Sequence, residues 1–264
     1  MIPRAKTMHA KEPVLKRTPL KDEVFQSLHE SVLAGRYSAG EWLRQEEISR
    51  RLGVSMTPVR EALDLLVSSG MAERVAYRGV RLLRPSNPDV LDSYELRLLL
   101  EGSAARSAAS NVSAEQILSL NELLQAEAAL LNLEGLPRQR EISRALHGRI
   151  VEASGNSLLH RIYLDVLRAF PDWMLYEHLY RNPELLQDSI CNEHREHEMI
   201  VAALAAHDPD AAVQRSVEHV LQRGRELVSY LGMPREALEA REAQIRRLIP
   251  GTELGAERLH KEAT

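Results

Sequence analysis

The sequence predicts a mainly α-helical protein with two parts, a small N-terminal domain that contains a β-hairpin and a larger all-helical domain. Three observations support this prediction. The chain has 264 residues, which is long for one compact domain and sufficient for two. Aromatic residues make up only 4% of the chain, whereas the helix-forming residues Leu, Ala, Glu and Arg are abundant. Apolar residues recur at helical spacing between clear Gly, Pro and capping signals.

The N-terminal domain is expected at 19–84, after a polar, basic arm at 1–18 that lacks apolar periodicity. A first helix begins after Pro19 and stops at Gly35. Two short helices, separated by Gly53, and two short strands should follow at 45–52, 57–69, 71–75 and 79–83. Tyr77, Arg78 and Gly79 form the turn between the strands, so the pair is expected to be a two-stranded wing.

A linker at 85–88 should lead to the all-helical domain at 88–232, with Asn87 and Pro88 as its first cap and turn. Capping residues, Gly and Pro divide this domain into six predicted helices at 88–109, 114–133, 138–153, 157–181, 184–206 and 209–231. Pro171 is expected to kink the fourth helix. Residues 233–264 are charged and predict a terminal helix followed by a frayed tail.

The two parts of the chain differ in net charge. Residues 1–85 hold 15 Lys and Arg against 10 Asp and Glu, and the rest holds 19 against 28. This asymmetry suggests that only residues 1–85 have a polyanionic partner, although chance segregation of charged residues on solvated faces would give the same counts. The single Cys191 cannot form an internal disulfide, the N-terminus has no secretory apolar core, and no apolar stretch approaches membrane-spanning length. A cytoplasmic protein is therefore expected.

The strongest motif lies around Gly53. A tight turn between two short helices allows the second helix to enter a DNA major groove with its N-terminal residues on base edges. Ser55, Met56, Thr57 and Arg60 fall on or near that first turn. The run Val54–Leu63 resembles the segment V-S-R-T-P-V-R-E-A-L of the GntR family of regulators, with nine of ten residues in order. The resemblance implies a winged helix-turn-helix domain.

The same resemblance implies roles for individual residues. Thr57 and Arg60 would contact the operator, and the wing residues Arg78 and Gly79 would approach the minor groove and backbone. The phosphate candidates are Arg44, Arg50 and Arg51. Met56 stands where the family usually has a base-contacting arginine, and its side chain has no donor for guanine. For Arg60, an i,i+4 ion pair with Asp64 is the alternative role.

The helical half resembles the FCD (FadR C-terminal domain), the ligand-binding domain of one GntR subgroup. In that family three histidines and an aspartate bind a divalent metal, and His147, His197 and His219 match the histidines. Ser143 stands at the aspartate position, and a serine hydroxyl is a poor neutral ligand. The implied zinc, nickel or manganese site would therefore bind its metal more weakly, use water instead, or have lost the metal. Spacing supports one pairing independently, because His197 and His219 both lie 11 residues from the turn at Asp208. Both would therefore stand about 16 Å from that turn on antiparallel helices.

Several other residues of the helical half each have two possible roles. Arg97 resembles the pocket arginine that would clamp an effector carboxylate, or it pairs with Glu101. His194 would lie behind the metal ligands or, as we expect, on the surface. The aromatic and sulfur side chains of Trp173, Met174, Tyr176 and Tyr180 either line a pocket or form ordinary core.

These features together predict a transcription regulator that is not an enzyme. It would bind a pseudo-palindromic operator in double-stranded DNA as a homodimer and respond to a small organic-acid effector, with a divalent metal as cofactor. Repression relieved by ligand is the expected mode. A metal-dependent hydrolase built on the three histidines is one alternative, but the chain has no H-E-x-x-H motif, nucleophile elbow or phosphate loop. A helical protein-interaction module without a small-molecule effector is the other.

Overall fold

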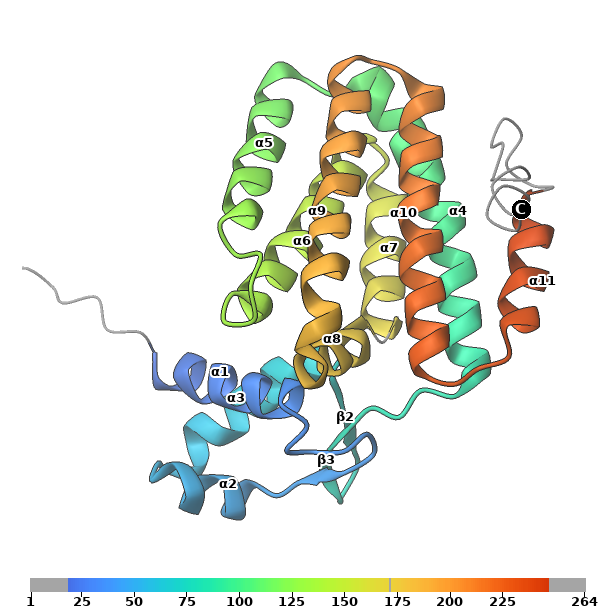
Figure 1. Ribbon diagram of the computed structural model, residues 1–264. Helices are drawn as coiled ribbons and strands as arrows, with labels where there is room; N and C mark the ends of the chain where they lie inside the picture. The colour runs from blue at the N-terminus through green and yellow to red at the C-terminus, as the bar shows by residue number, and fades with distance from the viewer. Residues whose placement is uncertain (1–18, 171, 247–264) are drawn as a thin grey trace, which may run out of the picture.

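The computed structural model in Figure 1 describes residues 19–170 and 172–246. The expected arm at 1–18, the kink at Pro171 and the tail beyond residue 246 lie outside the described residues. The predicted fold class is confirmed: a small N-terminal domain with three short strands lies below a larger bundle made entirely of helices. No helix in the described part of the chain is long and apolar enough to cross a membrane.

The small domain contains three helices and three strands. They are α1 (Leu20–Leu33), β1 (Trp42–Leu43), α2 (Gln45–Leu52), α3 (Met56–Ser68), β2 (Ala72–Val75) and β3 (Gly79–Leu82). The predicted two-stranded wing is present as β2 and β3, and the structure adds β1, which pairs antiparallel with β3 and makes a sheet of order β1-β3-β2. A strand of two residues is too short to produce a readable alternation of apolar and polar positions.

The turn at Gly53 has the predicted local cause. Gly53 is the C-cap of α2 with φ of +67°, a left-handed conformation that glycine adopts without steric cost. The next helix, α3, begins at Met56, one residue before the predicted start. Ser55 occupies its N-cap position, but the Ser55 hydroxyl makes no capping hydrogen bond.

The larger domain begins at Asn87 and is followed by the terminal helix that the sequence predicts within 233–264. The helices are α4 (Asn87–Asn111), α5 (Ala114–Ala128), α6 (Leu136–Ala153), α7 (Ser157–Ala169), α8 (Asp172–Arg181), α9 (Pro183–Ala205), α10 (Pro209–Tyr230) and α11 (Arg235–Arg246). The predicted helix at 157–181 is therefore two helices. Helix α4 is capped by a box between Ser86 and Asp89 rather than by Asn87, whereas the predicted box at Ser113 and Gln116 is present.

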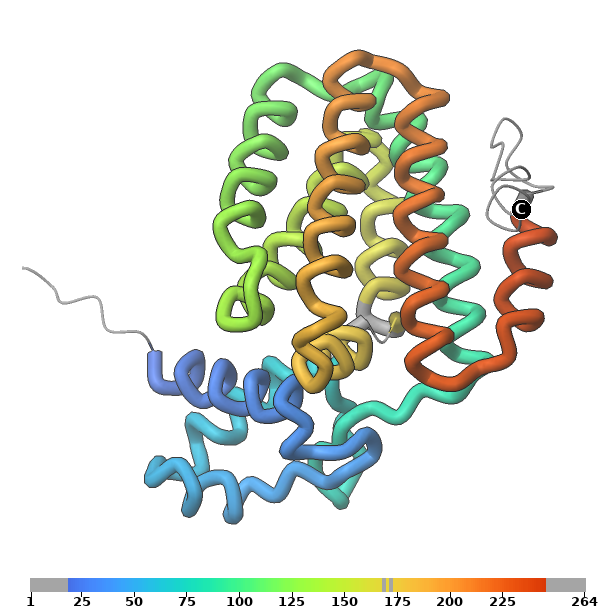
Figure 2. Tube along the Cα trace, viewed as in Figure 1, coloured from blue at the N-terminus to red at the C-terminus, as the bar shows by residue number. Residues whose placement is uncertain are grey.

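Two long helices form the centre of the bundle. The tube in Figure 2 shows α4 and α10 side by side, with α9 on the other flank of α10. Gly224 of α10 faces the Tyr94 ring of α4, and a Cβ at position 224 would meet that ring at 2.1 Å. The absence of a side chain at Gly224 therefore permits this close packing.

The two domains exchange side chains at their boundary. Helix α8 packs against α1, and its Trp173, only 1% exposed, belongs to the hydrophobic core of the small domain. In the other direction, Leu33 at the end of α1 belongs to the core of the bundle. The core of each domain is thus completed by a residue from the other.

Candidate functional site

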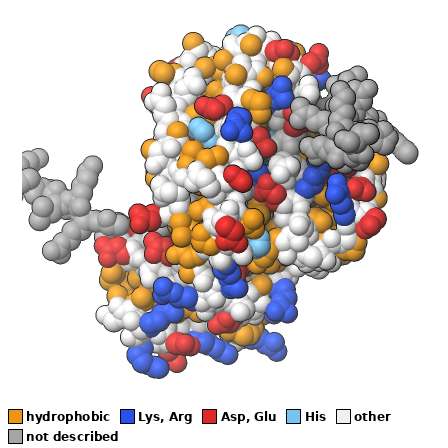
Figure 3. Space-filling model, viewed as in Figure 1, with side chains coloured by type: hydrophobic (Ala, Val, Ile, Leu, Met, Phe, Trp, Pro, Cys, Tyr) orange, Lys and Arg blue, Asp and Glu red, His pale blue; other side chains and the backbone are white. Residues whose placement is uncertain are grey.

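The predicted DNA-contacting residues lie on the surface of the small domain. Exposed side chains come from α2 and its N-cap, from the start of α3 and its N-cap, and from the turn between β2 and β3: Arg44, Arg50, Arg51, Ser55, Met56, Thr57, Arg60 and Arg78. In Figure 3, Lys and Arg side chains gather at the lower end of the molecule, where this domain lies. The surface combines positive charge with an accessible helix N-terminus, as a duplex-binding surface requires.

Arg60 does not form the ion pair that was considered as its alternative role. Asp64 pairs instead with Arg74 of β2. Within the described part of the chain Arg60 makes no ion pair, and its side chain is exposed next to Thr57 on α3. Its guanidinium is therefore available to an external partner.

The wing ends in an exposed turn. Tyr77 has φ of +60° and a fully exposed side chain, and Gly79 follows with φ of +108°. A Cβ at Gly79 would meet no atom within 4 Å, so the positive φ, and not crowding, accounts for glycine at this position.

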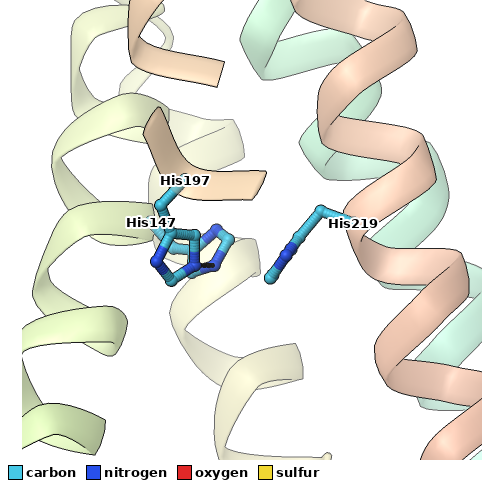
Figure 4. Close-up of side chains that lie close together, drawn as sticks. All are labelled: His147, His197 and His219. Carbon is cyan, nitrogen blue, oxygen red and sulfur yellow. Dashed lines mark hydrogen bonds between the residues drawn. The ribbon is translucent and has the colours of Figure 1, made fainter. Parts of the chain in front are cut away.

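Three histidines of the bundle converge on one point, as Figure 4 shows. His147 comes from α6, His197 from α9 and His219 from α10, and one nitrogen of each lies within 4.8 Å of the others. The Nε2 atoms of His147 and His197 are 3.2 Å apart. All three side chains are buried, so this cluster is an internal site of the bundle.

A separate glutamate holds the outer nitrogen of each ring. The Nδ1 of His147 lies 3.1 Å from Glu101, that of His197 lies 3.0 Å from Glu127, and that of His219 lies 2.8 Å from Glu196. A carboxylate at Nδ1 keeps the hydrogen on that nitrogen and leaves the lone pair on Nε2. The Nε2 lone pairs of His147 and His197 then face each other, and with His219 beside them the three imidazoles could hold a metal ion.

Burial and charge set the protonation of this group. Burial lowers the pKa of His219 well below its usual value, and His147 and His197 lower it further. Burial also acts to lower the pKa of His197, but its hydrogen bond with Glu127 outweighs this and raises the pKa. For Glu101, burial acts to raise the pKa, but Arg97 and His147 hold it at about 2. Burial raises the pKa of Glu196 to about 7.

His194 is not the surface residue that we expected. Its Nδ1 lies 2.8 Å from Glu127, which also holds His197, and its side chain is only 13% exposed. Glu127 is therefore shared by two imidazoles, one turn apart on α9. The second interpretation of His194, as a group behind the histidine cluster, matches this position.

A cavity adjoins the histidine cluster. Its polar lining includes Arg97, Arg144, Arg223, Ser143 and Glu193, and Phe170 and Tyr176 contribute aromatic surface. Arg97 is buried and pairs with Glu101 at 2.8 Å, so the ion pair considered for it is present while the residue also lines the cavity. A buried cavity with three guanidinium groups is suited to an anionic ligand.

Ser143 lies in this cavity, one turn before His147 on α6. Its hydroxyl donates a hydrogen bond to Glu193 at 3.1 Å. Among the four aromatic and sulfur candidates, Tyr176 lines the cavity, Trp173 packs in the small domain, and Met174 and Tyr180 pack against hydrophobic cores.

Sequence reasoning missed the glutamates and two of the arginines. Arg223 could have been found, because it lies one turn after His219, and Glu193 lies one turn before His197. Glu101 was considered only as a partner of Arg97. Glu127 gave no signal, because it lies 70 residues from His197 in the chain.

One cavity residue also reaches the small domain. Arg144 of α6 lines the cavity and donates a hydrogen bond to the carbonyl oxygen of Ser69, at 3.2 Å. Ser69 is the C-cap of α3. A direct contact thus connects the wall of the cavity to the helix that carries Thr57 and Arg60.

Comparisons with known proteins agree with both parts. Residues 20–82 match the bacterial regulatory proteins of the gntR family, and residues 92–222 match the FCD domain. One relative, a probable D-xylose utilization operon transcriptional repressor of Paenarthrobacter nicotinovorans, is 30% identical over 81% of this chain and 91% of its own length. The transcriptional repressor NanR of Enterobacter sp. (strain 638) is 25% identical over 78% of this chain and 84% of its own length.

The fold also resembles a solved structure. The structure of Escherichia coli McbR/YncC aligns with a TM-score of 0.56 at 22% identity, and the alignment covers 81% of this chain and all of that one. At this level of identity the likeness concerns the fold alone.

Proposed function

Because the chain belongs to the gntR family of bacterial regulatory proteins and carries an FCD domain, we propose that it is a repressor that releases its operator when a small organic acid binds in the bundle. That it is a DNA-binding regulator of transcription follows from the family. We propose in addition that it represses transcription, forms a dimer, binds a small effector and holds a metal ion. Its strongest support is Arg144, which lines the internal cavity and contacts the recognition helix.

The proposed DNA contacts use the exposed surface of α2, α3 and the wing. Thr57 and Arg60 would read base edges, Met56 would make an apolar contact in place of a guanine contact, and Arg78 and Gly79 would follow the minor groove. Arg44, Arg50 and Arg51 would neutralise phosphates. Two copies of α3, related by a two-fold axis, would match a pseudo-palindromic operator.

The homodimer would form through the helical domains. Helices α4 and α7 pack against each other and expose the apolar side chains of Leu96, Leu158 and Ile162. Exposed leucine and isoleucine on neighbouring helices support an interface between copies. A regulator of the chromosome would work in the cytoplasm and would need no catalytic activity.

The effector would be a carboxylate bound in the cavity. Arg97 presents a guanidinium that Glu101 and the Phe170 ring hold in place. Arg223 is 6% exposed, and within the described residues its Nε has no hydrogen-bond partner. Either arginine could donate charge-assisted hydrogen bonds to an anion, and the water-poor surroundings would strengthen them.

A divalent cation such as zinc, nickel or manganese fits the three histidines. With each Nδ1 bound to a carboxylate, the Nε2 lone pairs of His147 and His197 face each other at 3.2 Å, which is unfavourable unless a cation or proton lies between them. His147, His197 and His219 would hold the ion, and the ion would supply positive charge for an effector carboxylate.

The effector would act on α3 through the domain boundary. Arg144 would exchange its bond to Ser69 for the bound anion, and the contact of α8 and Trp173 with the small domain would transmit the change. Effector and operator binding would then be coupled reciprocally.

The test is operator binding by the full-length protein, measured by fluorescence anisotropy with duplexes from upstream of its own gene. We expect salt-sensitive binding to one duplex, and release by at least one member of a panel of small carboxylates, with added zinc or manganese in parallel samples. A protein without salt-sensitive affinity for any duplex would contradict the regulator. Operator binding that no carboxylate changes, with no shift in melting temperature, would contradict the sensor alone.

A further inference from the structure

We infer that Glu193 is the anionic ligand that completes the three-histidine site, so that the chain holds its cation through three nitrogens and one carboxylate oxygen. The inference rests on the metal site of the proposed function. It adds a ligand that lies on a different helix from Ser143, the residue at the aspartate position of the family.

Two pairs of side chains meet between α6 and α9, one helical turn apart. In the first, Nε2 of His147 lies 3.2 Å from Nε2 of His197. In the second, Oγ of Ser143 lies 3.1 Å from Oε1 of Glu193. Ser143 precedes His147 by four residues and Glu193 precedes His197 by four, so all four side chains lie on the facing sides of the two helices. The Glu193 carboxylate therefore occupies the place that an acidic side chain at position 143 would fill.

Glu193 also has an incomplete set of counter-charges. It is 3% exposed, and it accepts hydrogen bonds from three uncharged groups: Ser143 at 3.1 Å, Tyr176 at 3.1 Å and Gln139 at 3.5 Å. Among the described residues Glu193 forms one ion pair, with Arg223 at 3.8 Å, and Arg223 is itself paired more closely with Glu226 at 2.9 Å. A buried carboxylate without a close counter-ion is costly, and a divalent cation beside it would remove that cost.

The other glutamates near the site already have partners of their own. Glu101 is held by Arg97 and His147, Glu127 by two imidazoles, and Glu196 by His219. Among the described residues that line the cavity, Glu193 is the one carboxylate. It does not belong to the compact group of ligand atoms formed by the three imidazoles, so it must turn from Ser143 toward them when the cation binds.

The experiment measures affinity for Zn²⁺ and Co²⁺ in full-length protein stripped of metal, by titration against a competing chelator. Glu193→Gln keeps the size and most hydrogen bonds of the side chain but cannot supply an anionic oxygen. We expect it to weaken binding by more than the roughly 10–100-fold that loss of a residue behind a ligand costs. Glu226→Gln, which removes a neighbouring charge from Arg223, is the matched control and should bind like the wild type.

Ser143→Asp in the Glu193→Gln background should restore most of the affinity, because it returns a carboxylate to the same place from α6. The visible spectrum of bound Co²⁺ should change with Glu193→Gln and return in the double variant. If Glu193→Gln does not fold, the infrared carboxylate bands of the wild type, recorded with and without Zn²⁺, decide whether a carboxylate coordinates.

Equal affinities for Glu193→Gln, Glu226→Gln and wild type would overturn the inference and leave the three-histidine site standing. A wild type that binds no metal would overturn both this inference and the metal in the proposed function. Operator binding and its release by carboxylates would still test the regulator separately.

Discussion

Replacing Trp173 by alanine tests whether the helical domain completes the core of the DNA-binding domain. Trp173 belongs to α8 of the bundle, which packs against α1, yet it is 1% exposed and part of the same hydrophobic cluster as residues of α1 and α3. Its removal should loosen the small domain more than the bundle that carries it.

The magnitude follows from the burial. A buried tryptophan removes about 200 Å² from water, worth about 5 kcal/mol at roughly 25 cal/mol per Å². Within the described residues the Trp173 Nε1 has no hydrogen-bond partner, so the substitution also relieves an unsatisfied donor, worth about 1–2 kcal/mol. The net loss should be about 3 kcal/mol. At about 1.4 kcal/mol per tenfold, amides of α1 and α3 should exchange about 100-fold faster.

Hydrogen exchange read out by mass spectrometry measures this effect. Leu120→Ala is the control, because Leu120 of α5 is equally buried in a separate part of the bundle and should cost about 2–5 kcal/mol without affecting α1. If α1 and α3 keep wild-type exchange in Trp173→Ala while α8 and α9 lose protection, the assignment of Trp173 to the small domain's core is refuted.

Three further predictions follow from the same contacts. Arg60→Ala should cost about 1–3 kcal/mol in operator binding, whereas Arg50→Ala should weaken the binding of all duplexes about equally. Anisotropy measures both affinities, and equal losses on operator and random DNA for both variants would contradict the roles given to these residues. His219→Ala should abolish the stabilisation by Zn²⁺, which in wild type should add about 2.7 kcal/mol to the free energy of unfolding at 100 times the dissociation constant. The rise in melting temperature measures this stabilisation, and an undiminished rise in the variant would place the metal elsewhere. Gly224→Ala should cost about 1–3 kcal/mol or more, because its Cβ would overlap the Tyr94 ring; an unchanged free energy of unfolding in urea would mean that α4 and α10 can separate without cost.

The features that were predictable from the sequence arise from local interactions. Gly53 sets the turn between α2 and α3 through its own backbone conformation, and the box at Ser113 and Gln116 lies within four residues. The equal distances of His197 and His219 from Asp208 needed only the helical rise and one turn. Such signals can be read from the sequence because the residues that interact lie close together in the chain.

The features that were not predictable depend on contacts between distant segments. Glu127 meets His197 across 70 residues, and no local pattern marks that pair. His194 was expected on the surface because a helical histidine beside charged residues usually is exposed, but α5 covers it and offers Glu127. Strand β1 was missed because two residues carry no periodicity, and only pairing with β3 defines it.

The carboxylates behind the histidines have a mechanical consequence. The three imidazoles and their three glutamates come from α4, α5, α6, α9 and α10, five helices that also share one hydrophobic cluster. A single ion at the centre would connect all five. Helices α7 and α8 would be tied to it indirectly, through Tyr163, which donates to Glu101, and Tyr176, which donates to Glu193. Loading or stripping that ion would then change the stiffness of most of the bundle in one step, and the hydrogen bond from Tyr176 to Glu193 would carry the change to α8, the helix that touches the small domain.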